Sequence, residues 1–142
     1  MARIKIDLPE KFSFSVSIPI RITDLNYGGH VGNDAILSLV HEARMQYLRQ
    51  FGYSEMNLGG IGLIMIDAGI EFKNELFYGD VVIVSVTCNP FSKVGFDIYY
   101  KLEKEINGSR KLVAVVKTGM IGYDYNTKKI ITIPEEVKAK LQ

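Results

Sequence analysis

The chain contains 142 residues, of which 47% are hydrophobic and 23% are charged, and its net charge is +1. This length predicts one domain, residues 1–142, with enough chain to bury a sizeable apolar core. The near-zero net charge argues against a nucleic-acid-binding face, so we expect no nucleic-acid partner.

The cysteine content and the N-terminus bear on the cellular compartment. Cys88 is the only cysteine, which excludes an internal disulfide bond and fits a reducing compartment. Residues 1–14 mix charged and apolar side chains and lack the apolar core of a signal peptide. No stretch approaches the length of a membrane span. The sequence therefore predicts a cytoplasmic protein without a membrane partner.

One strand and one long helix are predicted in the first third of the chain. Apolar residues alternate with polar ones over residues 12–23, and Pro19 places this strand near a sheet edge because proline cannot donate to a ladder. A helix is predicted over residues 33–51, with Asn33 or Asp34 as its cap and Gly52 beyond its end. Apolar residues cover more than one face of this helix, so we expect it to be buried on several sides.

Four further strands are predicted after the helix, over residues 63–72, 80–89, 96–105 and 111–123. Asn89-Pro90 and Asn107-Gly108 mark turns between them, and the second pair is a strong hairpin signal. A short helix is predicted over residues 134–141. Short links favour antiparallel pairing, so the pattern indicates an α+β fold whose sheet curls around the long helix. The open edge of such a sheet invites pairing with a second copy.

Polar residues are concentrated between the first predicted strand and the long helix. Residues 23–33 contain an acid, two amides, a histidine and three glycines. Asp24 can activate a water molecule or, alternatively, bond the N–H groups of the turn. Asn26 can orient water or hold a substrate oxygen, and His30 can act as a general base at neutral pH. We take these three residues as candidate catalytic residues.

Backbone groups of the same segment are candidates for substrate binding. Gly28 and Gly29 permit positive φ and the close approach of a ligand. The N–H groups of Val31 and Gly32 can polarise a carbonyl if they lie at the helix start. Helix N-termini suit this task because they carry unpaired donors and positive partial charge.

Three motifs resemble those of one enzyme family. Residues 21–33 resemble the Asp-x-Asp-x-x-Gly-His-Val-x-Asn pattern of hotdog-fold thioesterases of the 4-hydroxybenzoyl-CoA thioesterase group. Glu42-Ala43-Arg44 resembles the end of that family's central helix, and residues 70–80 resemble its strand–turn–strand segment. The resemblance covers residues 12–123. It implies the hotdog fold, which is a curved antiparallel five-stranded sheet wrapped around a long central helix.

The resemblance also implies an activity and an assembly. It implies a thioesterase that hydrolyses an acyl-CoA or acyl-carrier-protein thioester, with coenzyme A present only as part of the substrate and no other cofactor. It implies a homodimer whose sheets join edge to edge, or a homotetramer, with active sites at the dimer interface. Lys93 lies in a turn where family members often meet the phosphates of coenzyme A. No metal is expected, because the sequence shows no metal-ligand spacing.

One departure from the family pattern keeps other functions open. Asn26 stands where many members have a second acid, and an amide is neither a general base nor a good nucleophile. Asp67, an acid within an apolar run, is a further candidate for the missing acid. A protein that binds an acyl thioester without hydrolysing it is one alternative. An enoyl-thioester hydratase is another, although Asp24 and His30 are out of step with the hydratase pattern.

Overall fold

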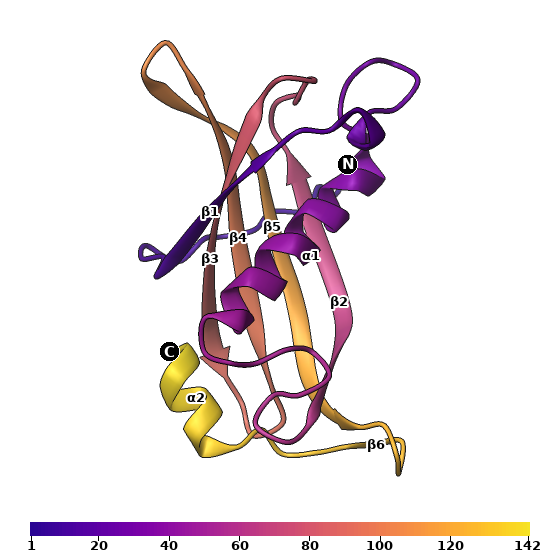
Figure 1. Cartoon of the computed structure of the whole chain (residues 1–142), viewed down its shortest axis with the longest axis vertical. Coiled ribbons are helices and arrows are strands. Elements are labelled where there is room, and N and C mark those ends of the chain that lie inside the picture. Colours follow the sequence, from indigo (N-terminus) through magenta and orange to yellow (C-terminus); the bar gives the residue numbers. More distant parts are fainter.

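The computed structural model describes residues 1–142 as an antiparallel sheet that curves around one long helix (Figure 1). The elements in chain order are β1 (Phe14–Pro19), the 3-10 helix η1 (Ile22–Asp24), α1 (Asn33–Arg49), β2 (Gly62–Phe72), β3 (Val81–Phe91), β4 (Gly95–Ile106), β5 (Ser109–Asp124), β6 (Lys129–Ile130) and α2 (Glu135–Leu141). The predicted α+β architecture is confirmed.

The strands follow the order β1-β3-β4-β5-β2, and every neighbouring pair is antiparallel. The two edges of the sheet are therefore β1 and β2. Pro19 pairs with Val81 at the end of β1, where a missing N–H interrupts no central ladder, as the sequence predicts. The two-residue β6 pairs with β5 and adds a short sixth strand to the five that were predicted.

The predicted end of the first strand is wrong. The strand stops at Pro19, and the chain then forms η1 over residues 22–24, although residues 22 and 23 were expected to stay extended. The cause is a local hydrogen bond, because the backbone N–H of Arg21 donates to the Asp24 carboxylate over 2.8 Å. A short side chain that bonds a nearby backbone group offers the chain a turn in place of a ladder.

The predicted turn at Asn89-Pro90 is also wrong, because both residues continue β3. A register shift between Cys88 and Phe91 accommodates the proline within the ladder. The reversal comes later, where the N–H of Ser92 donates to the carbonyl of Gly95 over 2.8 Å. In contrast, the Asn107-Gly108 hairpin between β4 and β5 is confirmed, and both residues have positive φ.

The long helix α1 is buried along most of its length, as predicted, and it packs against β1 and β3. Its buried residues are Ile36, Leu39, Val40, Ala43, Arg44, Tyr47 and Leu48. The helix ends at Arg49, two residues earlier than expected, and Gly52 follows with a φ of 78°. Neither Asn33 nor Asp34 caps the helix start, because Gly32 is the N-cap residue and no side chain bonds there.

A polar network lies between α1 and the sheet. The Arg44 side chain is only 6% exposed, and its Nε donates to Glu55 over 2.7 Å while its Nη1 donates to the Tyr100 hydroxyl over 3.1 Å. The Tyr100 hydroxyl also bonds Thr118 over 2.9 Å. His41 Nε2 lies 3.2 Å from the Glu55 carboxylate. No buried side-chain nitrogen or oxygen in the chain lacks a hydrogen-bond partner.

The edge strand β2 differs from the interior of the sheet in its exposure. Met65, Ile66 and Phe72 are 44%, 58% and 50% exposed. This edge therefore presents apolar side chains next to unpaired backbone groups, which is an arrangement that favours pairing with another chain. None of the helices is long and apolar enough to span a membrane.

Candidate active site

The glycine-rich segment forms a tight loop between η1 and α1. The N–H of Asn26 donates to the carbonyl of His30 over 2.8 Å, and the N–H of Gly29 donates back to the carbonyl of Asn26 over 3.1 Å. Gly29 has a φ of 81°, as predicted, but Gly28 does not have positive φ. A side chain at Gly28 would be crowded instead, because its Cβ would lie 3.1 Å from Asn26 Oδ1 and 3.4 Å from His30 Nε2.

The loop thus brings two of the three predicted catalytic side chains, Asn26 and His30, to the same point. Asn26 Oδ1 accepts a hydrogen bond from the N–H of Gly28 over 2.8 Å, which fixes the orientation of the amide. His30 Nδ1 lies 3.2 Å from the carbonyl oxygen of Val31. Because a carbonyl can only accept, we assign the ring proton to Nδ1, which leaves the lone pair of Nε2 free.

The segment between β2 and β3 holds His30 from the other side. His30 Nε2 lies 3.9 Å from the Glu75 carboxylate, and the Phe77 ring packs edge-on against the imidazole with the ring centroids 6.5 Å apart. Lys104 anchors this segment, since its Nζ donates to the carbonyl of Glu75 over 2.7 Å and lies 3.2 Å from Asp80 Oδ2. The sequence analysis named none of these residues as part of the site, because they come from a different region of the chain.

Asp24, the third predicted catalytic residue, has a structural environment. The residue is 5% exposed, and its carboxylate accepts bonds from the backbone N–H, Nε and Nη2 of Arg21. Burial alone would raise the pKa of Asp24, but the bonds and the charge of Arg21 outweigh burial and hold it below the usual value. These bonds match the alternative expectation of a carboxylate that stabilises the turn. The hydratase alternative requires Asp24 to share a water with His30, and these bonds direct the carboxylate to Arg21 instead.

The two backbone donors that the sequence favoured are occupied within the fold. The N–H of Val31 donates to the carbonyl of Leu76 over 2.9 Å, and the N–H of Gly32 donates to the carbonyl of Asp24 over 3.3 Å. Neither group is available to polarise a substrate carbonyl, so this part of the prediction is corrected. The helix begins at Asn33, as predicted, and the N–H groups of Asn33 and Asp34 have no hydrogen-bond partner.

A hollow of about 230 Å³ opens beside the start of α1. It is lined by His30, Val31, Asn33, Ile36, Phe72, Lys73, Asn74, Glu75, Leu76 and Val113. The hollow therefore combines the imidazole of His30 with the residue that carries an unpaired helix N–H. An unpaired backbone donor and an imidazole lie together here, which is a combination that can polarise a carbonyl and take a proton from water.

Lys93 is not brought to this hollow within one chain. It lies in the turn between β3 and β4, and its carbonyl accepts a bond from the N–H of Ile133 over 3.0 Å, just before α2. This turn lies at the lower end of the sheet in Figure 1, whereas the glycine loop lies at the upper end. The predicted role of Lys93 toward coenzyme A therefore requires the turn of a second copy.

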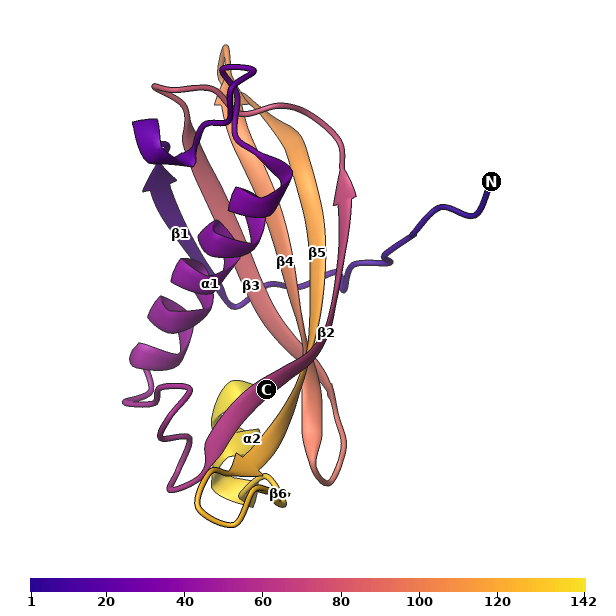
Figure 2. The same ribbon diagram turned by 90° about the vertical axis from the view of Figure 1, so that its right-hand side faces the viewer.

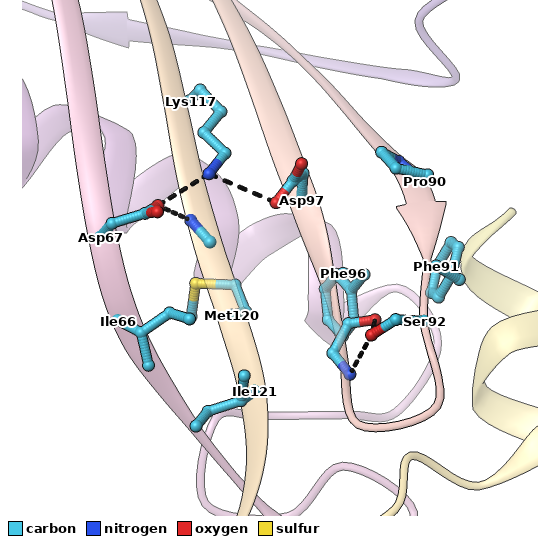
Figure 3. A pocket seen from close by; sticks show the side chains of 12 residues that line it. Ile66, Asp67, Pro90, Phe91, Ser92, Phe96, Asp97, Lys117, Met120 and Ile121 are labelled. Carbon is cyan, nitrogen blue, oxygen red and sulfur yellow. Dashed lines mark hydrogen bonds and ion pairs between the residues drawn. The ribbon is translucent and has the colours of Figure 1, made fainter.

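Within one chain, Asp67 is engaged by residues outside the glycine-rich loop. Its carboxylate lies 2.8 Å from Lys117 Nζ and accepts a bond from the N–H of Gly119 over 2.9 Å. Figure 3 shows Lys117 between Asp67 and Asp97, with the second carboxylate 3.4 Å from the ammonium. The side-chain bond from Lys117 is the main reason that the pKa of Asp67 lies below its usual value. None of these residues lines the hollow beside His30.

The hollow thus places the imidazole of His30 near Asn33, whose backbone N–H has no partner. Residues 20–141 match the model of the Thioesterase-like superfamily, and the chain belongs to this family. The predicted relationship to hotdog thioesterases of the 4-hydroxybenzoyl-CoA thioesterase group is confirmed.

Two curated relatives and one solved structure illustrate the similarity. A putative esterase of Aquifex aeolicus is 34% identical over 98 residues, which cover 68% of this chain and 72% of that protein. A 1,4-dihydroxy-2-naphthoyl-CoA hydrolase of Microcystis aeruginosa is 29% identical over 122 residues, which cover 84% and 86%. A crystal structure of a 4-hydroxybenzoyl-CoA thioesterase variant in complex with 4-hydroxybenzoyl-CoA shares the fold, with a TM-score of 0.82 at 15% identity over 91% of this chain and 98% of the other.

Proposed function

We propose that this chain is an acyl-CoA thioesterase that hydrolyses its substrate in the hollow beside the start of α1. The observation that carries the proposal is that Asn33, whose backbone N–H has no partner, lines the same hollow as His30. Family membership supports thioester hydrolysis, and the name of the Microcystis relative supports a coenzyme A ester over an acyl-carrier-protein substrate.

The geometry supports a direct attack by water. The N–H of Asn33, strengthened by the positive end of the α1 dipole, donates to the thioester oxygen and stabilises the negative charge that develops there. His30 Nε2 removes a proton from a water molecule as its oxygen attacks the carbonyl carbon. The carbon–sulfur bond then breaks, and the imidazolium returns the proton to the leaving thiolate. The carboxylate of Glu75, 3.9 Å from Nε2, stabilises the imidazolium between these steps.

Asn26 has an accessory role in this mechanism. Its amide is fixed by the N–H of Gly28 and lies beside His30, so it can hold the attacking water without taking its proton. Asp24 acts indirectly. Its carboxylate accepts bonds from Arg21 and its backbone carbonyl accepts a bond from the N–H of Gly32, and together these bonds fix the loop ahead of the helix.

The decisive experiment removes the N–H of Asn33 and keeps the helix. Asn33→Pro is suited to this test, because Asn33 is the first helical residue and proline is favoured there. Gly32 already has φ −69° and ψ 152°, which a following proline accepts. Asn33→Ala keeps the N–H and loses only the side chain, so it is the matched control.

Thiol release from a panel of short, long and aryl CoA esters is the measurement. We expect Asn33→Pro to lower kcat by about 10²- to 10³-fold and Asn33→Ala to stay near the wild type. Equal activity of the proline variant and the alanine variant, with both folded, would contradict the role of this N–H. Absence of turnover by the wild type on every ester would contradict the proposed function.

The non-catalytic alternative is favoured by one observation, which is Asn26 at the position of the usual second acid. A protein of this kind would bind an acyl-CoA in the hollow through the same N–H and release no thiol. The panel above distinguishes the two functions, because binding with no turnover would identify a thioester-binding protein.

The assembly that we propose is a homodimer or homotetramer formed through the β2 edge. The exposed apolar residues of β2 and its unpaired backbone support this interface, and it would bring the Lys93 turn of a second copy toward the hollow. Light scattering of the wild type and of Ile66→Lys tests it, since a lysine in the middle of this edge should favour the monomer. The cytoplasmic location stays a prediction from the sequence.

A further inference from the structure

The first thirteen residues form an extended arm that precedes β1. Figure 2 shows the arm crossing the face of the sheet opposite α1 and continuing past β2 at the edge. The Phe12 ring lies 4.9 Å below Lys101 Nζ of β4, and Ile6 bonds a residue of β2. The arm therefore carries its first five residues from the β1 side of the sheet to the opposite edge.

Glu71 of β2 fixes the arm at this edge. Its Oε2 accepts a bond from the backbone N–H of Ile6 over 2.8 Å, and its Oε1 lies 3.6 Å from Lys73 Nζ. The bond from Ile6 is the largest cause that holds the pKa of Glu71 below its usual value, and the charges of Lys73 and Lys5 act in the same direction. One carboxylate thus holds the arm and a lysine of the β2 end together.

A hollow of about 670 Å³ lies between the arm and the end of β2. It is lined by Ala2, Arg3, Ile4, Lys5, Ile70, Glu71, Phe72 and Lys73. Three of these residues are cations and one is an anion, so the hollow carries an excess of two positive charges. The chain as a whole has a net charge of only +1, so this concentration of charge is local.

The basic hollow adjoins the candidate active site at the end of β2, although the arm lies on the opposite face of the sheet from α1. Phe72 and Lys73 line both this hollow and the smaller one that contains His30 and Asn33. A substrate whose acyl carbon lies beside His30 would pass around the sheet edge at Phe72 and Lys73 to reach Arg3 and Lys5. A ligand that spans both hollows would be neutral at one end and anionic at the other.

We propose that the N-terminal arm completes a phosphate-binding subsite in which Arg3, Lys5 and Lys73 bind the nucleotide phosphates of the acyl-CoA substrate. Arginine presents a planar fork to phosphate oxygens, and the two lysines add point charges. Glu71 pairs with Lys73 and holds the arm through the N–H of Ile6, while Arg3 and Lys5 form no ion pair with a carboxylate. The inference rests on the proposed thioesterase function, and it adds the part of the substrate that the hollow beside His30 does not bind.

The test compares two substrates with the same acyl group, the coenzyme A thioester and the pantetheine thioester, which lacks the nucleotide and its phosphates. The variant is the double substitution Arg3→Ala and Lys5→Ala. Lys128→Ala with Lys129→Ala is the matched control, because these exposed lysines lie at the start of β6 and line neither hollow. For the arm variant we expect KM for the coenzyme A ester to rise about tenfold, with kcat and the pantetheine KM unchanged.

Salt provides an independent reading, because phosphate recognition by exposed cations weakens as ionic strength rises. The wild-type KM for the coenzyme A ester should increase with salt, and the KM of the arm variant should increase less. A Lys93→Ala variant is measured in parallel, and the proposal expects a smaller effect there than in the arm variant.

Two results would overturn the subsite and leave the thioesterase function intact. One is an unchanged KM for the coenzyme A ester in the arm variant, and the other is an equal rise for both substrates, which would indicate a general structural effect. If the wild type turned over neither substrate, the thioesterase function would fail by itself. Calorimetry would then compare the affinities of free coenzyme A and of pantetheine for the same variants, and this comparison would decide whether the arm recognises phosphate.

Discussion

Two polar regions of this molecule lie at α1 and differ in how completely their groups are paired. In the network around Arg44, the guanidinium, Glu55, the Tyr100 hydroxyl and Thr118 satisfy one another between the helix and the sheet. At the helix start, the N–H of Asn33 has no partner, and the imidazole of His30 has a free nitrogen beside a hollow.

The difference indicates which region serves stability and which can serve a ligand. Buried polar groups are costly unless they are paired, so the closed network around Arg44 holds the helix on the sheet. Donors that stay unpaired at a partly open position can bind a substrate without first breaking an internal bond. The polar groups at the middle of α1 are therefore all paired, whereas the start of α1 keeps unpaired donors.

The largest expected effect comes from removing the proposed base, His30, beside the start of α1. His30→Ala should lower kcat on a coenzyme A ester by about 10²- to 10⁴-fold while leaving the fold intact, because the side chain is partly exposed. His41→Ala is the matched control, since His41 is the only other histidine and lies on the helix away from the hollow. Steady-state thiol release measures both variants. Equal activity of His30→Ala and the wild type would remove His30 from the mechanism.

The next effect is on stability and comes from removing one member of the hydrogen-bonded network around Arg44. Arg44→Met should lower the free energy of unfolding by about 3–5 kcal/mol, because Glu55 and Tyr100 would lose their buried partner. Arg49→Met removes an exposed cation from the same helix and should change stability by less than about 0.5 kcal/mol. Urea denaturation of the two variants makes the comparison. Similar urea midpoints for the two variants would show that the network contributes no more to stability than an exposed charge does.

A smaller effect, which is a gain in kcat, is expected from placing a carboxylate in the glycine-rich loop beside His30. Asn26→Asp should raise kcat by about tenfold, because the new carboxylate would lie beside the attacking water and could take its proton. Asn57→Asp is the control, since Asn57 also bonds a glycine N–H in a turn, at a distance from the hollow. A folded Asn26→Asp protein without any gain would argue that this side chain does not reach the reacting water.

The smallest effect concerns the support of the loop by Asp24. Asp24→Asn should cost about 1–2 kcal/mol at pH 7, because it weakens the bonds to Arg21. The pKa of Asp24 is lowered in the fold, so its contribution is complete above the unfolded pKa and is lost as the pH falls below 3.8 toward the folded pKa. Denaturation at several pH values should show the two stabilities converging in acid. A constant difference at all pH values would contradict the assignment.

Much of the fold could be predicted because local patterns and tertiary packing agree. The alternation of apolar residues gave the strands, Pro19 marked an edge, and Asn107-Gly108 marked a hairpin. The predictions that were wrong lie where a side chain changed the backbone. The carboxylate of Asp24 turned a strand end into a 3-10 helix, and a register shift kept Pro90 inside β3.

The sequence by itself determined the residue types of the candidate site, because a histidine, an amide and glycines ahead of a helix define one polar loop. Only the tertiary structure decided which backbone donor is available. Val31 and Gly32 are occupied by Leu76 and by Asp24, and the free N–H belongs to Asn33.

The structure also decided which distant residues join the loop. Glu75 and Phe77 reach His30 from the segment after β2, and Arg3 and Lys5 reach the same edge from the other end of the chain. Residues this far apart in sequence carry no common local pattern, since their positions arise from strand pairing across the sheet and from the path of the N-terminal arm. A local pattern can therefore predict the polar loop, whereas the surroundings that give it a function depend on long-range contacts.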